Sequence, residues 1–101
     1  LSSVCLWFAD LTGANLSRAD LSRANLRYAN LNCANLNCAN LRHAYLSGAK
    51  LTSANLTDAD LRKTNLTDAD LTGARMPEGF INKQKIKVKK SSETEPSGPD
   101  V

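Results

Sequence analysis

The side chains in this chain that are best suited to catalysis or metal binding are one histidine, His43, and three cysteines, Cys5, Cys33 and Cys38. A histidine in a catalytic triad needs a carboxylate that orients it and a nucleophile within reach. Zinc usually takes four ligands, supplied in pairs two to four residues apart, whereas Cys33 and Cys38 are five residues apart. Whether any of these side chains can converge depends on the backbone that carries them.

That backbone is defined by a five-residue hydrophobic period. All fifteen leucines, from Leu1 to Leu71, fall at intervals of five, and each alanine from Ala9 to Ala74 lies two places before such a position. On an α-helix this interval rotates successive leucines by about 140°, so they form no apolar stripe. On a straight strand it sends them to opposite faces. A backbone that turns by about a right angle every five residues keeps them all inward, and this predicts a solenoid with about 20 residues per coil.

The run from Ala14 to Tyr28 reads A-N-L-S-R, A-D-L-S-R, A-N-L-R-Y and resembles the pentapeptide-repeat family, whose motif is A-[DN]-L-x-x. The resemblance covers residues 4 to 76. It implies an all-β fold, a right-handed quadrilateral parallel β-helix of about four coils, and little about function, because the family is functionally diverse. Departures are few: Val4 and Thr64 replace the alanine, and Cys5, Tyr45, Lys50 and Arg75 replace the Asn or Asp.

Such a coil predicts a core of stacked leucines and alanines, with neighbouring coils about 4.8 Å apart. We expect the Asn or Asp before each leucine at an outward corner, where its side chain bonds the turn backbone. Cys33 and Cys38 then lie on adjacent faces and His43 on a third, surrounded by arginines and Lys63. The sequence therefore predicts no enzyme, no metal site and no cofactor.

Two outward surfaces are candidate partner sites. The basic ladder, Arg23, Arg42, Arg62 and Lys63, would place cations on successive coils, although Asp20 and Asp60 flank the same face. The aromatic patch, Trp7, Phe8 and Tyr28, is expected to lie beside Arg27 and has the composition of an interface hot spot. A third face, with Thr12, Asn32, Thr52 and Thr72, is featureless, and substitutions there are expected to be tolerated.

Composition divides the chain at residue 80. Residues 1–80 are expected to form the β-helix, closed by a C-terminal cap of Met76, Phe80 and Ile81, and residues 81–101 a basic and then polar disordered tail.

The start in repeat register at Leu1, without an initiator methionine, predicts that the chain is the C-terminal part of a larger protein. No apolar run has the length of a membrane span, and three scattered cysteines suit a reducing compartment. We expect a cytoplasmic or nuclear location and no membrane partner.

These features favour a rigid, non-enzymatic scaffold that binds a protein, with self-association through the N-terminal end as a further expectation. Two alternatives stay open. The chain could be the substrate-recognition arm of a BTB-type ubiquitin-ligase adaptor, or a DNA mimic that protects gyrase. The formal net charge of +3 argues against DNA mimicry, and the near balance of charges over residues 1–80 argues against binding nucleic acid.

Overall fold

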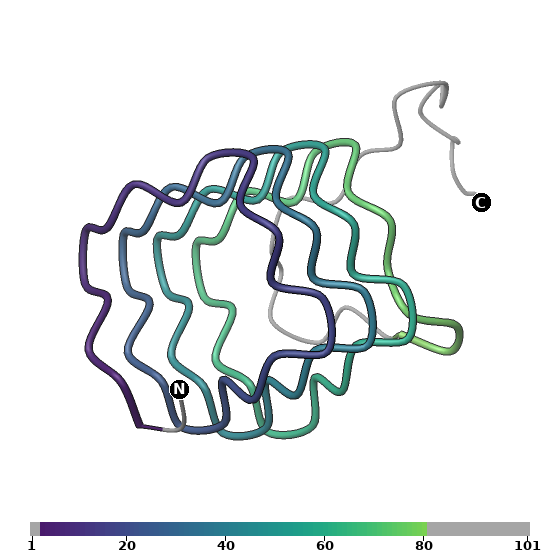
Figure 1. Ribbon diagram of the computed structural model, residues 1–101, viewed down its shortest axis with the longest axis horizontal. Helices are drawn as coiled ribbons and strands as arrows, with labels where there is room; N and C mark the ends of the chain where they lie inside the picture. Colours follow the sequence, from purple (N-terminus) through teal and green to yellow (C-terminus); the bar gives the residue numbers. More distant parts are fainter. Residues whose placement is uncertain (1–2, 81–101) are drawn as a thin grey trace, which may run out of the picture.

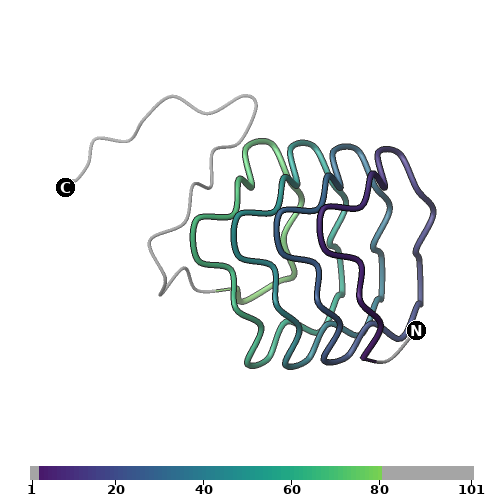
Figure 2. The ribbon, with the colours of Figure 1, turned by 90° about the vertical axis from the view of Figure 1, so that its left-hand side faces the viewer.

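The structure, a computed structural model, describes residues 3–80, which wind into a stack of coils (Figure 1). Those residues contain no helix and no continuous strand. Their backbones pair through isolated parallel bridges between residues twenty apart, from Cys5 with Asn25 to Asn55 with Arg75. Successive coils therefore lie side by side in one unbroken register (Figure 2). The predicted twenty-residue period of a parallel solenoid is confirmed, and no helix of residues 3–80 is long and apolar enough to cross a membrane.

The backbone changes direction after every leucine, at the two residues that follow it. The Leu41 carbonyl accepts the N–H of Ala44 at 3.0 Å, and the other leucines of the described repeats make the same contact. The second of the two intervening residues has a positive φ, 61° at His43 and 70° at Gly48. A hydrogen bond over three residues with a positive φ at the third position defines a type II turn.

The predicted position of Asn and Asp at the corners is therefore wrong. These residues form the parallel bridges, in the straight segment between alanine and leucine. Their side chains do bond the turn, as expected: Asn35 Oδ1 accepts the N–H of Asn37 at 3.0 Å, and the same contact recurs at most repeats. The corner itself needs no Asn or Asp, because the positive φ and the bond to the leucine carbonyl already close the turn.

Lys50, which replaces Asn or Asp, cannot accept a hydrogen bond from its turn. The Thr52 N–H instead donates to Asn32 Oδ1 of the preceding coil, at 3.0 Å. Arg75 needs no such substitute, because the residue two places on is Pro77, which has no N–H. The third face is consequently not featureless, since Asn32 bonds the next coil.

The core is a column of leucines and alanines enclosed by the coils. From Leu21 to Leu56 every repeat leucine is buried, as are Leu66 and Leu71, whereas Leu61 and the three leucines at positions 6, 11 and 16 are half-buried. The expectation that all of these positions are buried is wrong for the first coil and for Leu61, because no further coil of residues 3–80 covers them, whereas Leu66 and Leu71 are buried in the last coil. Thr64, in an alanine position, is also buried, and its hydroxyl donates to the Leu41 carbonyl.

Beyond the last repeat, Met76 and Phe80 pack against the core. The Phe80 N–H donates to the Pro77 carbonyl at 3.1 Å, which turns the chain back over the coil. Beside this turn a hollow of about 480 Å³ remains, with Leu61 and Leu66 in its lining. Ile81 and the tail to residue 101 lie outside the described residues, so the domain division at residue 80 stays a prediction.

Candidate partner-binding surfaces

The three rings of the aromatic patch touch one another. Phe8 and Tyr28 are second turn residues on successive coils, and their rings stack with centroids 5.1 Å apart and planes 13° apart. The Trp7 ring lies 5.0 Å from that of Phe8, tilted by 53°. All three side chains stay exposed, at 57% for Trp7, 62% for Phe8 and 54% for Tyr28. The coil register thus brings together the residues that the sequence predicted to gather.

Gly48 extends this stack to a third coil. It lies twenty residues after Tyr28, and a Cβ built on it would come within 2.5 Å of the Tyr28 ring. The ring therefore rests directly on the glycine backbone, where any side chain would displace it. Sequence analysis missed this role, although the twenty-residue offset between a tyrosine and a glycine was the signal.

The Arg27 backbone lies one coil from Trp7 and Phe8, as predicted, and its carbonyl accepts the N–H of Phe8 at 3.0 Å. The side chain turns to Tyr45 instead, with the guanidinium carbon 4.4 Å from the centroid of that ring, in a cation–π contact. Tyr45 replaces the Asn or Asp of its repeat and is 41% exposed. The contact arises because the Tyr45 carbonyl accepts the N–H of Leu26, which sets Tyr45 beside the turn that carries Arg27.

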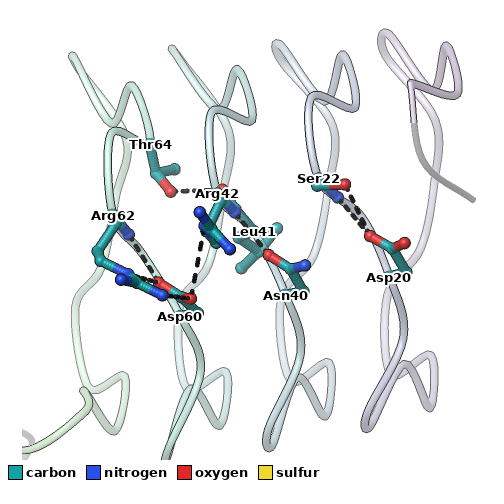
Figure 3. A network of polar contacts seen from close by, with 8 residues as sticks. All are labelled: Asp20, Ser22, Asn40, Leu41, Arg42, Asp60, Arg62 and Thr64. Carbon is teal, nitrogen blue, oxygen red and sulfur yellow. Dashed lines mark hydrogen bonds and ion pairs between the residues drawn. The ribbon is translucent and has the colours of Figure 1, made fainter.

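The basic ladder is interrupted by Asp60 (Figure 3). Arg62 donates to both carboxylate oxygens, from Nε at 2.9 Å and from a terminal nitrogen at 2.7 Å, whereas Arg42 Nε stays 3.8 Å away. The hydrogen bond from Arg62, with help from the Arg62 backbone N–H and the two arginine charges, lowers the pKa of Asp60 to about 2. The same hydrogen bond raises the pKa of Arg62. Arg62 is therefore neutralised locally and contributes little to a positive surface.

Two other members of the basic ladder lie in one outward file with the histidine. Arg23, His43 and Lys63 are second turn residues on successive coils, with φ of 61°, 61° and 62°, and all three are exposed. No ion pair joins Arg23 or Lys63 to a carboxylate of residues 3–80. Arg23, Arg42 and His43 line a hollow of about 350 Å³, completed by Ser22 and Asn40.

The thiols stay apart. Cys5 and Cys33 are exposed and Cys38 is half-buried, and all three are free. Within residues 3–80, no three His, Cys, Asp or Glu side chains come together in a way that could hold a metal ion. The hollow beside His43 contains no Asp or Glu in its lining. The expectation that the chain binds no metal and catalyses no reaction stays a prediction.

Turns of one type, repeated every five residues around a leucine and alanine core, define a parallel β-solenoid. The family model described as pentapeptide repeats matches residues 5–37 and 39–76, in eight copies. The chain therefore belongs to the pentapeptide-repeat family. A comparison with curated proteins finds no match.

Several solved structures resemble the chain. The pentapeptide repeat protein alr5209 of Nostoc PCC 7120 is 34% identical, with 87% of this chain and 83% of that one covered and a TM-score of 0.46. HetL from Nostoc sp. strain PCC 7120, involved in heterocyst differentiation regulation, is 37% identical. The match covers 81% of this chain and 51% of HetL, with a TM-score of 0.43. A thylakoid-lumen protein of Arabidopsis thaliana, AT2G44920, is 36% identical. The match covers 79% of this chain and 55% of that protein, with a TM-score of 0.40. The family assignment rests on the repeat match alone.

Proposed function

We propose that this solenoid is a rigid, non-enzymatic module that binds a protein partner, and that the aromatic patch is the centre of the binding surface. The observation that carries the proposal is the contact of Trp7, Phe8 and Tyr28 with one another while more than half of each side chain stays exposed. Together with Tyr45, they are all the large hydrophobic side chains that are exposed within residues 3–80. Contiguous exposed apolar area of this kind is typical of interaction sites.

The composition of the surface supports a protein as the partner. Tryptophan, tyrosine and arginine are the residues that most often dominate the binding energy of protein interfaces. Arg27 adds a cation placed over the Tyr45 ring, 4.4 Å from its centroid.

Rigidity favours binding through this surface. Phe8 and Tyr28 are carried by turns whose N–H groups bond the next coil, Phe8 to the Arg27 carbonyl and Tyr28 to the Ser47 carbonyl, both at 3.0 Å. Mutual stacking and the contact with Gly48 further restrict the rings. Side chains that are already ordered lose less conformational entropy when a partner binds. A small number of fixed rings can therefore provide most of the affinity.

The proposal is tested by comparing partner recovery among single alanine variants of the full chain. Phe8→Ala and Tyr28→Ala each remove one ring of the stack. Ser53→Ala is the matched control, because Ser53 is also an exposed second turn residue, with φ of 60° against 63° at Phe8, and lies outside the patch.

We expect the two ring variants to lower recovery of a specific partner at least about tenfold, as for hot-spot residues, and Ser53→Ala to leave it unchanged. Binding through the rings should also vary little with salt, unlike binding through the basic ladder. If Phe8→Ala and Ser53→Ala recover the same partner equally well, the aromatic patch is not the binding surface.

A further inference from the structure

The hollow between the turns at Ser22 and Arg42 gathers hydrogen-bond donors from two adjacent coils. Its lining holds two guanidinium groups, one imidazole and one amide, from Arg23, Arg42, His43 and Asn40, and no carboxylate. Asp20 pairs with Asn40 in a parallel bridge, and the Arg23 N–H donates to the Arg42 carbonyl at 2.9 Å, so the two turns are locked side by side. The donors left to a ligand are therefore side chains.

The carboxylates on this side of the coil are already engaged. Asp20 Oδ1 accepts the Ser22 hydroxyl at 2.7 Å and the Ser22 N–H at 3.1 Å. Asp60 accepts three hydrogen bonds from Arg62, one from the backbone and two from the guanidinium, and its contact with Arg42 is longer, at 3.8 Å (Figure 3). Arg42 is therefore ion-paired with Asp60 only through this long contact, and its guanidinium makes no shorter bond to residues 3–80, which leaves donors for a ligand in the hollow.

Asn40 is oriented as a donor toward a ligand. Its Oδ1 accepts the N–H of Arg42 at 3.1 Å, which closes the turn and leaves the Nδ2 group as the part of the amide that can serve a ligand. An amide donor, two guanidinium groups and an imidazole together require an acceptor with several oxygens.

We propose that this hollow binds a phosphate monoester, with Arg23 and Arg42 as the principal ligands and His43 and Asn40 as further contacts. A carboxylate carries one negative charge and two oxygens, so two guanidinium groups and two further donors would have to share them. A phosphate monoester presents three acceptor oxygens and close to two negative charges at neutral pH, which matches donors arriving from two coils. A phosphorylated side chain and inorganic phosphate share this chemistry. The proposal does not depend on the aromatic patch.

The test titrates inorganic phosphate, and separately a short phosphoserine peptide, into the labelled full chain while the NMR signals of the arginine Nε–H groups are followed. The titration is made well above the second phosphate pKa of about 6, so that the dianion is present. Variants are Arg23→Gln and Arg42→Gln. Arg18→Gln is the matched control, because Arg18 is an exposed second turn residue with φ of 62° that carries the same charge but does not line the hollow.

We expect saturable shifts at Arg23 and Arg42, and about tenfold weaker binding in each of the two variants, the effect of losing one charged hydrogen bond. Arg18→Gln should stay within about twofold, since an exposed charge that does not line the hollow is largely screened. Tighter binding of the peptide than of phosphate would support a phosphorylated side chain as the natural ligand, and equal binding would support the phosphate group alone. The proposal is overturned if no saturable shift appears, if acetate at equal ionic strength gives the same shifts, or if Arg18→Gln weakens binding as much as Arg42→Gln.

Discussion

Replacing Asn32 by alanine should destabilise the solenoid, although Asn32 lies on the outer surface. Its Oδ1 is the acceptor for the Thr52 N–H of the next coil, at 3.0 Å. In most turns this N–H bonds the Asn or Asp two places before it, but Lys50 occupies that position and has no acceptor. Asn32→Ala therefore leaves the Thr52 N–H without its acceptor.

The magnitude follows from burial. Leaving a buried donor without an acceptor costs about 1–3 kcal/mol, and we expect about 1 kcal/mol here, because Thr52 is half-buried and water can reach part of the turn. Asn37→Ala is the matched control. Asn37 occupies the same turn position and is also half-buried, but the Thr57 N–H of the next coil already bonds Asn55 Oδ1 at 3.0 Å. Its cost should stay within about 0.5 kcal/mol.

The mechanism is tested by a double-mutant cycle in urea denaturation. Lys50→Asn supplies the missing acceptor within the turn itself, so Asn32→Ala in that background should cost no more than about 0.5 kcal/mol. The coupling free energy between positions 32 and 50 should therefore approach the whole destabilisation caused by Asn32→Ala alone. Equal costs for Asn32→Ala and Asn37→Ala, or a cost of Asn32→Ala that Lys50→Asn does not reduce, would refute the reasoning.

Three further predictions concern the core, the aromatic stack and the one strongly shifted carboxyl. Leu41→Ala should cost about 2–5 kcal/mol in chemical denaturation, and Leu6→Ala clearly less, because Leu6 is only half-buried. Gly48→Ala should cost about 0.5–1.5 kcal/mol more than Gly13→Ala, since both have φ near 70° but only the first displaces a stacked ring; equal melting temperatures would contradict this. Asp60 has a lowered pKa in the folded chain, so its ionised form contributes to folding stability. That contribution is present above about pH 4 and is lost as pH falls through about 2. Stability should therefore fall less over that range in Asp60→Asn than in the wild type, by about 1 kcal/mol or less after solvent screening, and parallel curves would contradict the pairing with Arg62.

The coil and its core could be predicted from the sequence because the five-residue period is strict. With every leucine from Leu6 to Leu71 in phase, only a backbone turning once per repeat keeps the leucines together. The position of the turn within the repeat was harder to predict. Asn and Asp favour turns, but here the same side chains bond a neighbouring turn from within a bridge, and the two arrangements give similar sequence patterns.

For the outer surfaces, the sequence predicted only which side chains become neighbours through the twenty-residue register. The file of Arg23, His43 and Lys63 and the meeting of Phe8 with Tyr28 follow from the twenty-residue offset. The choice of Arg62 rather than Arg42 as the main partner of Asp60 depends on side-chain rotamers, which the register leaves open. Proximity on the coil therefore gave the candidates but not their pairing.

The positive φ at every second turn residue divides the outer surface into two classes of site with different tolerance for substitution. Twelve such residues in the described repeats are not glycine, and none of them is Val, Ile or Thr, whose branched Cβ is most strained in this conformation. The residue just before such a position accepts threonine readily, as at Thr52, Thr57 and Thr67. Any change of this surface is therefore restricted at the second turn residue to glycine and to side chains that are unbranched at Cβ, while the first turn residue is free of that restriction. New binding specificities would arise most easily by varying the first site and keeping long unbranched or aromatic side chains at the second.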